Sequence, residues 1–413
     1  MTKRFGWAVL FALLLSGCVG MPDKEGWHSS QKEEFLQILQ EDKYASLCGD
    51  EALYNKVRQS EDSRLMFKLL VDYTNHLANS CIDIQSFKAA QQERKTPKFK
   101  TAYEIYRQKV DPNTIRAELK AGKSIEEILK PYIPAYREFG RLLAAYKTLE
   151  KEPNVDPEKL RKVRLSLERV KLMKPLTSKN YVLVNIPEFR VRVIEDGKTA
   201  VSMKVIVGKK RLQTPIFGEG LKYIVVNPQW NVPDSIARNE VIPKSLKNPG
   251  YLARNGLVIR KDYNLESPAQ KFDPALASNY VGGKGPVPFK FIQPPSKHND
   301  LGRVKFLFPN NHSVYMHDTQ SKHLFKRTVR CYSHGCVRLE RPNEMLRHII
   351  EHYTNLTWDE AKEKYDSLKT HYITITKPLP VHTAYLTAYV EDDGTVHFFN
   401  DIYGYDRIQK LKK

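Results

Sequence analysis

The pattern of apolar and polar positions changes near residue 179, and this change divides the chain into two predicted parts. Between residues 31 and 175, apolar residues recur every three or four positions, as in Leu142-Leu143-Tyr146-Leu149. This spacing predicts amphipathic helices. Asp111-Pro112 and Asp156-Pro157 are typical of helix starts, because the acid can cap the first turn and proline fits its first position. We therefore expect an α-helical scaffold region with its own core over residues 31–175.

After residue 179 the pattern is that of strands. Residues 181–186, 189–194 and 200–207 are rich in β-branched residues, and Asp196-Gly197 predicts a tight hairpin between the last two. The expected fold class is α+β, with the helical region followed by a mainly antiparallel β-domain with flanking helices. Further strands are predicted at 222–227, 257–260, 304–308, 314–316, 372–376, 381–390 and 396–399, and helices at 342–353 and at 358–368, where Thr357 is the expected cap.

The first residues have the composition of an export signal. Lys3 and Arg4 precede an apolar run over residues 7–15 that is too short to span a bilayer. The following Leu15-Ser16-Gly17-Cys18 resembles a bacterial lipobox, in which the cysteine is lipidated after cleavage. Residues 1–18 are thus predicted to be a lipoprotein signal peptide, and residues 19–30 a short polar tether. An ordinary cleaved signal with an incidental cysteine is the alternative.

The predicted signal bears on location and partners. Val19 follows Cys18, where inner-membrane lipoproteins have Asp, so the resemblance favours the periplasm with a lipid anchor in the outer membrane. The chain carries a net charge of +20 at pH 7. An exported protein is not expected to meet nucleic acid, so an anionic polymer or membrane surface is the expected partner of this charge.

The candidate chemistry lies in His317 and in the stretch Ser333-His334-Gly335-Cys336-Val337-Arg338. A cysteine nucleophile needs a nearby imidazole to take its proton. Gly335 allows close approach of the backbone to a substrate, and the amides of Gly335 and Cys336 are expected to face an oxyanion. A buried thiol beside a structural histidine is the plain alternative. A zinc site made from His312, His317 and His334 is a further one, although their spacing matches no helix-borne zinc pattern.

This stretch resembles the L,D-transpeptidase catalytic domain, whose signature is a histidine, a spacer and then Ser/Thr-His-Gly-Cys. Met316–Thr319, Ser321–Phe325 and Tyr403–Asp406 resemble the larger Gram-negative branch of that family, so the similarity covers residues 179–406. The resemblance implies a β-sandwich with a capping insertion at 231–288. It also implies that Cys336 is the nucleophile and that His317 is the proton donor and acceptor.

The same resemblance suggests roles for further residues. Arg338 is expected to hold a substrate carboxylate, a task that suits a guanidinium group. Ser333 and Tyr315 are candidate substrate contacts, as is Lys322, and His334 is expected to shape the loop. The Asp318 carbonyl is expected to orient His317. Trp230, Tyr251 and Tyr280 are candidate walls of the groove, with simple core packing as the alternative for each.

The implied reaction is acyl transfer between stem peptides of peptidoglycan. Cys336 attacks a tetrapeptide stem, releases D-alanine and passes the acyl group to a second stem, giving a 3→3 cross-link between diaminopimelate residues. No cofactor and no metal are implied, and carbapenems are expected to acylate the cysteine. An L,D-carboxypeptidase, an exchange of D-amino acids, lipoprotein attachment to the wall and a non-catalytic wall-binding lipoprotein remain alternatives. The helical region is expected to serve as a scaffold or to bind a wall-synthesis protein.

Five cysteines are present. If Cys18 is lipidated and Cys336 is catalytic, Cys48 and Cys81 form the natural disulfide pair in an oxidising compartment. Cys331 is then the one cysteine of the five without an expected partner or role. We expect it to be a buried free thiol, and a reversible disulfide with Cys336 is the alternative.

Overall fold

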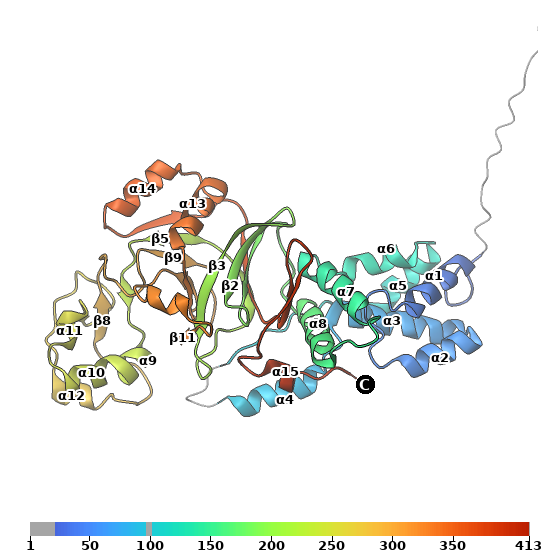
Figure 1. The fold of residues 1–413 in the computed structure, drawn as a ribbon, viewed down its shortest axis with the longest axis horizontal. Coiled ribbons are helices and arrows are strands. Elements are labelled where there is room, and N and C mark those ends of the chain that lie inside the picture. The colour runs from blue at the N-terminus through green and yellow to red at the C-terminus, as the bar shows by residue number, and fades with distance from the viewer. Residues whose placement is uncertain (1–20, 96–100, 413) are drawn as a thin grey trace, which may run out of the picture. The chain divides into compact units, whose positions relative to one another are not determined.

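The computed structural model describes residues 21–95 and 101–412, which form two compact units. The first unit comprises the described residues up to 78 together with 108–133, and the second comprises 79–107 and 134–412, apart from the undescribed 96–100. The predicted signal peptide and Cys18 lie outside the described residues. No helix of the part that is described is long and apolar enough to cross a bilayer. The order of the elements along the chain can be followed in Figure 1.

The first unit is helical. Within it Trp27, which is 1% exposed, stacks on Phe35 with ring centroids 5.8 Å apart. The predicted tether at 19–30 is therefore wrong for this part of the chain, because an apolar side chain anchors it before the first helix begins. The helices are α1 (Ser29–Gln40), α2 (Glu51–Ser60), α3 (Ser63–Asn79), α5 (Pro112–Lys120) and α6 (Ile125–Leu129), followed by the short turn η1 (Lys130–Tyr132).

Three helices that the sequence assigned to one helical region belong instead to the second unit. These are α4 (Ile84–Arg94), α7 (Arg137–Leu149) and α8 (Pro157–Val170). Leu165 of α8 and Phe87 of α4 are fully buried in the same core as the strands. The prediction of a single region 31–175 with its own core is thus corrected. Helical periodicity reveals that a helix has an apolar face, but not which element covers it.

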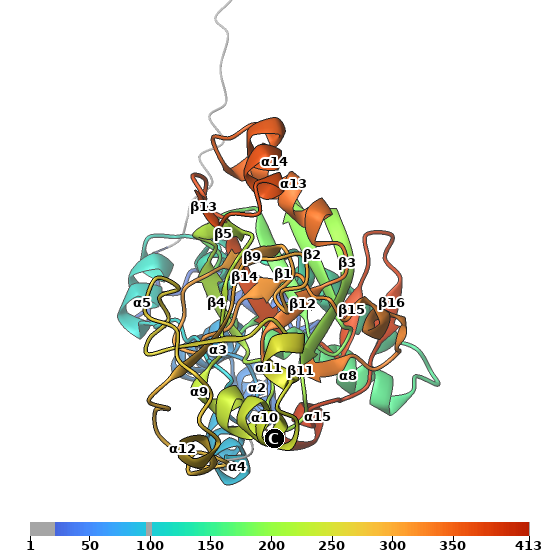
Figure 2. The same cartoon turned by 90° about the vertical axis from the view of Figure 1, so that its left-hand side faces the viewer.

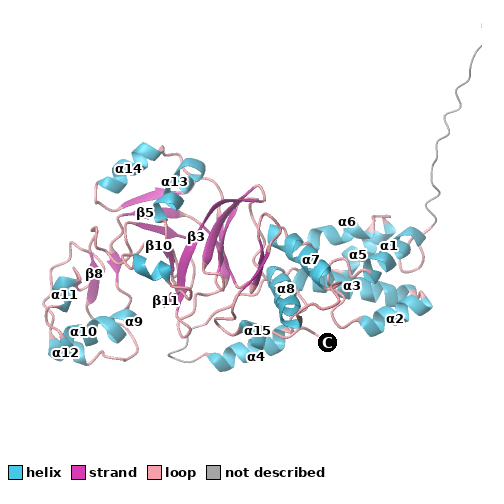
Figure 3. Ribbon diagram, in the orientation of Figure 1, coloured by secondary structure: helices cyan, strands magenta, loops and turns pink. Residues whose placement is uncertain are grey.

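The second unit is built on a sheet of eleven strands, and the prediction of a mostly β domain after the helices is confirmed (Figure 3). Ten strands follow the order β13-β5-β9-β10-β12-β3-β2-β1-β14-β4, and β11 pairs with β3. Most neighbours are antiparallel, while β1–β14, β10–β12 and β3–β11 are parallel. The strands are β1 (Tyr181–Asn185), β2 (Arg190–Glu195), β3 (Lys198–Gly208), β4 (Phe217–Gly220), β5 (Tyr223–Val226), β9 (Val304–Leu307), β10 (Met316–His317), β11 (Cys331–Ser333), β12 (Val337–Leu339), β13 (His371–Thr374) and β14 (Pro380–Ala384).

Local sequence signals account for much of this domain. Asp196 and Gly197 both have positive φ in the turn between β2 and β3, as the hairpin signal predicts. Helix α13 (Pro342–Tyr353) has the predicted bounds, and Thr357 caps α14 (Trp358–Asp366) by accepting from the Glu360 amide. The predicted strand at 381–390 is interrupted, because the chain leaves β14 and forms a separate hairpin of β15 (Ala388–Val390) and β16 (Val396–Phe398). The final helix is α15 (Tyr405–Ile408).

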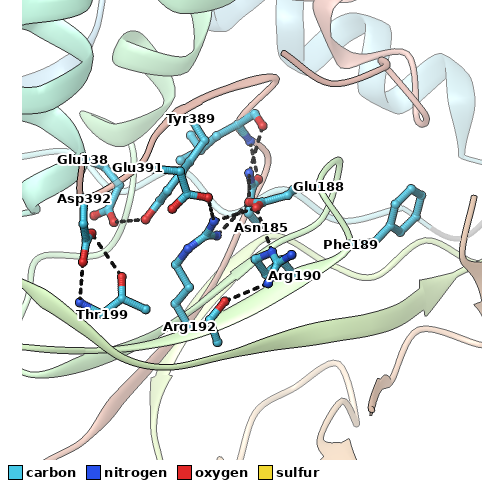
Figure 4. Close-up of polar contacts among 12 residues, drawn as sticks. Glu138, Asn185, Glu188, Phe189, Arg190, Arg192, Thr199, Tyr389, Glu391 and Asp392 are labelled. Atoms are coloured by element: carbon cyan, nitrogen blue, oxygen red, sulfur yellow. Dashed lines mark hydrogen bonds and ion pairs between the residues drawn. The ribbon is translucent and has the colours of Figure 1, made fainter. Parts of the chain in front are cut away.

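A buried polar cluster joins this hairpin to the sheet, as Figure 4 shows. Arg192 of β2 is 1% exposed and binds Glu188 through two hydrogen bonds of 2.8 and 2.6 Å. The same guanidinium binds Glu391 at 2.5 Å and lies over the ring of Tyr389. The Tyr389 hydroxyl in turn donates to Glu138 of α7. Because each buried charge has an opposite charge in contact, the cluster avoids the cost of an unpaired buried ion and ties α7 to the β-domain.

Residues 230–293 form a small subdomain with its own core, so the predicted insertion at 231–288 is extended at both ends by strands of its sheet. A three-stranded sheet is made of β6 (Trp230–Asn231), β8 (Lys290–Gln293) and β7 (Val258–Arg260). Around it lie α9 (Asp234–Ile236), η2 (Ala237–Val241), α10 (Ile242–Lys247), α11 (Tyr251–Arg254) and α12 (Pro274–Ser278), which appear together in Figure 2. The core comprises Val232, Ala237, Val241, Ile242, Leu257, Ile259, Ala277, Val287, Phe289 and Phe291.

Candidate active site

The candidate site lies on one face of three adjacent strands, β9, β10 and β12. His317 is paired with Lys305 of β9 and with Arg338 of β12. Side chains alternate between the faces of a sheet, so these three lie on the same side. On the other side, the neighbouring Met316 and Val337 are fully buried in the hydrophobic core. The core therefore fixes which way the polar side chains point.

Cys336 immediately precedes β12 and lies on this polar face. The Val337 amide donates to the Tyr315 carbonyl at 3.1 Å, which places Cys336 beside Tyr315 at the start of the parallel pair. Tyr315, His317, Cys336 and Arg338 line one cavity of about 320 Å³, which we call the reaction cavity. The structure thus brings the predicted nucleophile and the predicted base into one cavity.

A second cavity, of about 530 Å³, also opens on Cys336. It shares Trp230 and Tyr315 with the reaction cavity and adds Lys305 and Tyr372 to its walls. Tyr372 is 67% exposed and lies on β13, far from the catalytic motif in sequence. Since both cavities reach the same thiol, groups can approach Cys336 from two sides.

The predicted aromatic walls differ in their positions. Trp230 lines both cavities, and Tyr251 lines the reaction cavity. Tyr280 instead packs edge to face on Phe289, with ring centroids 6.2 Å apart, against the core of the insertion. It lines neither cavity among the described residues. For Tyr280, then, the plain packing alternative is correct.

Ser333 stabilises the turn that presents Cys336. Its hydroxyl donates to the Cys336 carbonyl at 2.5 Å and accepts from the Gly335 amide at 3.1 Å. The Gly335 amide is therefore occupied within the loop, which corrects the expectation that it faces an oxyanion. The Cys336 amide has no acceptor among the described residues. Of the two backbone amides that were expected to face an oxyanion, the amide of Cys336 is thus the one that remains available.

Thr214 and Tyr403 stabilise this turn through hydrogen bonds. The sequence did not reveal this role for either residue. Gly335 has φ +125°, which only glycine adopts readily, and its carbonyl accepts from the Thr214 hydroxyl at 2.8 Å. The same hydroxyl accepts from the Gly208 amide at 2.9 Å. The Tyr403 hydroxyl donates to the Gly208 carbonyl at 2.6 Å and accepts from the Thr214 amide at 3.2 Å. The downstream Tyr403 motif therefore positions the catalytic loop.

His334 connects the loop to the insertion. Its Nε2 lies 2.5 Å from a carboxylate oxygen of Glu240 in η2. His334 is the largest factor lowering the pKa of Glu240, which falls to about 2. Glu240 thus remains ionised near neutral pH. The expected loop-shaping role of His334 gains a defined partner that the sequence did not reveal.

The electrostatics of the site favour a neutral resting pair. Burial raises the pKa of the Cys336 thiol, against the opposing effects of hydrogen bonds from Tyr315 and of the positive charges of Lys305 and Arg338. Burial, followed by the charge of Arg338, lowers the pKa of His317 to about 3. At neutral pH the site therefore holds a thiol and an uncharged imidazole.

The environment of the His317 ring combines burial with contacts to the backbone. The ring is buried, and its Nδ1 has no hydrogen-bond partner among the described residues. Hydrogen bonding to the backbone of Asp318 and of Leu301 nevertheless opposes the lowering of the His317 pKa. The Asp318 carboxylate binds Lys322 at 2.6 Å, which gives Lys322 a structural partner.

Arg338 retains donors for a ligand. Its Nε is buried and has no hydrogen-bond partner within the described ranges. Burial lowers the pKa of Arg338, and the nearby Asp300 carboxylate opposes this effect. Both side chains line the reaction cavity. A guanidinium in this position can bind a carboxylate.

The remaining histidine and cysteine candidates are His312, which lines the second cavity, and the other three described cysteines. His312 pairs with Glu104 at 2.7 Å, and no group of three or more His, Cys, Asp or Glu in residues 21–95 and 101–412 is arranged to hold a metal ion. Cys48 and Cys81 are both disulfide-bonded, whereas Cys331 and Cys336 are free thiols. Cys331 is half-buried, and burial raises its pKa to about 11.

Comparison with known proteins shows which family this domain is similar to. Residues 179–357 match the family model of the L,D-transpeptidase catalytic domain known as YkuD. Residues 179–357 are therefore similar to that catalytic domain. A protein of Haemophilus influenzae described as "Putative L,D-transpeptidase" is 28% identical over 274 residues, which cover 66% of this chain. The chain spans about half of that relative's length, 53%.

Solved structures also align with the chain, at low similarity. An L,D-transpeptidase from Mycobacterium smegmatis aligns with 13% identity and a TM-score of 0.22, covering 49% of this chain and 58% of that one. The catalytic domain of an E. faecium L,D-transpeptidase aligns with 12% identity and a TM-score of 0.18, covering 49% of this chain and 95% of that one.

Proposed function

We propose that this protein is a peptidoglycan L,D-transpeptidase that forms 3→3 cross-links through a thioester on Cys336. The observation that carries the proposal is the placement of Cys336, His317 and Arg338 on one strand face around a single cavity. The family match supports the reaction class. In this proposal Arg338 binds a carboxylate of the donor stem and so places the scissile carbonyl at the thiol.

The first half-reaction forms the thioester. As Sγ of Cys336 attacks the carbonyl carbon of the third residue of a tetrapeptide stem, His317 takes the thiol proton. The Cys336 amide donates to the developing oxyanion. When the tetrahedral intermediate collapses, the C–N bond breaks and His317 returns the proton to the departing amine of D-alanine.

The second half-reaction transfers the acyl group. The side-chain amine of a diaminopimelate residue on a second stem attacks the thioester, and His317 removes its proton. The C–S bond breaks, and the thiolate regains a proton from His317. Two cavities that reach the same sulfur suit a donor and an acceptor that must be bound on either side of it.

The decisive experiment is digestion of purified disaccharide-tetrapeptide with the protein and with Cys336→Ala, followed by mass spectrometry. A 3→3 dimer and free D-alanine, both absent with the variant, are the expected products. Tripeptide without dimer would assign an L,D-carboxypeptidase instead. Exchange of the terminal residue for an added D-amino acid would identify the exchange activity. A failure to consume the tetrapeptide would contradict the proposal.

The same proposal includes a location in the periplasm, with lipidation of Cys18 as the outer-membrane anchor. It rests on the lipobox-like sequence described above. Radiolabelled palmitate incorporated by the whole chain in cells, and lost in Cys18→Ala, is the expected result. Retention of the label in that variant would contradict the anchor without affecting the proposed reaction. The first helical unit is proposed as the surface for a wall-synthesis partner.

A further inference from the structure

A third cavity lies beside the catalytic loop and is lined by four cationic side chains. Its volume is about 570 Å³. Lys209 and Arg211 come from the segment after β3, while Arg238 and Lys284 come from the insertion. We call this group the cationic subsite. Glu240 is the one carboxylate among the described residues of its wall, and it is already bound to His334.

Arg238 gives this cavity an unsatisfied donor set. The residue is only 9% exposed, and neither its Nε nor its Nη1 has a hydrogen-bond partner among the described residues. Buried polar groups in folded proteins are normally paired, because an unpaired one loses its hydration without compensation. Because Arg238 lines the cavity, an anion that entered it would supply the missing acceptors.

The cationic subsite is continuous with the site of the reaction. Its cavity shares Ile236, Glu240 and His334 with the reaction cavity, and it shares Ile236 and His334 with the larger cavity that also reaches Cys336. A ligand that filled both regions would pass along His334. The geometry therefore suits one extended molecule with a reactive group at Cys336 and an anionic group some distance away.

We propose that the cationic subsite binds a carboxylate of the wall peptide remote from the carbonyl that Cys336 attacks. This inference rests on the proposed function and adds a specificity determinant to it. Guanidinium groups pair with carboxylates through two parallel hydrogen bonds, and two of the four cations are arginines. The subsite contributes to binding, and so acts on the Michaelis constant more than on the rate of acyl transfer.

The test measures binding without chemistry. Full-length Cys336→Ala protein is titrated calorimetrically with disaccharide-tetrapeptide, alone and combined with Arg238→Gln. We expect this second substitution to weaken binding at least about tenfold, as loss of a charge-assisted pair does. Arg254→Gln is the matched control, because Arg254 is an exposed arginine of the same insertion that lines none of the three cavities. That control is expected to bind as the parent does.

A second variant tests the cationic subsite if Arg238→Gln does not fold. Arg211 and Lys284 are both exposed, so the double variant Arg211→Gln/Lys284→Gln removes two charges without disturbing a core. It is expected to weaken binding in the same direction. Amidating the remote carboxylate of the peptide should weaken binding to the parent and have no further effect in Arg238→Gln.

Three results would overturn the inference. Equal peptide binding by the parent and by both charge variants is one. An unchanged penalty for amidation in Arg238→Gln is another. The third is inorganic phosphate binding that is lost in Arg238→Gln while peptide binding is retained, which would make the subsite a phosphate site. A normal cross-linking reaction in any of these cases would leave the proposed function intact, so the two can fail separately.

Discussion

His334 Nε2 lies 2.5 Å from a carboxylate oxygen of Glu240, in a hydrogen bond between the loop of Cys336 and the insertion. His334 lies two residues before Cys336. Glu240 lies in η2 and precedes His334 by almost a hundred positions in the sequence. The contact directly connects the loop of Cys336 to the insertion, whose residues line the reaction cavity. It offers a way to separate acyl transfer from hydrolysis, because an insertion held over the site limits the access of water.

Glu240→Gln should loosen this connection. A hydrogen bond to a charged group such as the Glu240 carboxylate contributes about 1.5–3 kcal/mol, so weakening it is expected to shift products from cross-linked dimer toward tripeptide. The ratio of the two species, measured by mass spectrometry, reports the change. Glu266→Gln is the control, since Glu266 is an exposed carboxylate of the same insertion. An unaltered ratio in Glu240→Gln would show that the contact between His334 and Glu240 does not control water access.

The thiol of Cys336 should react slowly at neutral pH in the absence of substrate. Burial raises its pKa, so little thiolate is present at pH 7. At high pH an ordinary cysteine is fully ionised, and its rate of alkylation by iodoacetamide no longer changes. The rate for Cys336 is expected to keep rising in that same pH range. Lys305→Met should move this profile further upward, because Lys305 favours the thiolate. A profile complete by pH 7 would contradict the neutral resting pair.

His317 should make the folded protein sensitive to acid. Its pKa falls to about 3 in the folded state, below the ordinary value of about 6.5, so the unfolded chain binds the proton first. Stability is therefore unaffected above pH 6.5 and declines between pH 6.5 and 3, by up to about 1.4 kcal/mol per pH unit. Denaturant unfolding of the wild type and of His317→Asn across this range measures the difference. Parallel curves for the two proteins would refute this assignment.

Thr214→Val should damage the catalytic loop while keeping the shape of the side chain. The substitution leaves the Gly335 carbonyl and the Gly208 amide without their buried partner, at a cost of about 1–3 kcal/mol each. We expect a lower turnover of tetrapeptide together with a lower melting temperature. Thr376→Val is the control, because Thr376 is exposed and its hydroxyl bonds only a carbonyl at the end of α13. Full activity in Thr214→Val would exclude a positioning role.

A carbapenem is expected to acylate Cys336 and leave an adduct visible by intact-mass spectrometry, whereas most penicillins react much less. The adduct should be lost in Cys336→Ala and retained in Cys331→Ala, since both thiols are free and only one lines the reaction cavity. An adduct that persists in Cys336→Ala would place the reactive group elsewhere.

The strands and the catalytic motif could be predicted because their signals are local. The β-rich runs at 181–194 and the turn at Asp196-Gly197 carry their own periodicity and turn chemistry. The His317 and Cys336 motif likewise needed no knowledge of distant partners. The bounds of α13 agree for the same reason, since its proline start and apolar stripe are continuous in sequence.

What the sequence could not reveal depends on distant parts of the chain. Lys305 joins the catalytic face only through the pairing of β9 with β10, and Glu240 reaches His334 only once the insertion has folded. The division of the helices between two units follows from which apolar faces meet. Tertiary packing determines which faces meet, and helical periodicity alone does not predict it.

The hydroxyl of Tyr403 joins Gly208 and Thr214 at the base of the turn that carries Cys336. During synthesis, every side chain of the catalytic face is made before this tyrosine. A nascent or truncated chain that stops short of it would thus contain the nucleophile and the base but lack the support that shapes their loop. The proposed cross-linking reaction would accordingly appear only after the C-terminal segment has been added and folded back onto β3.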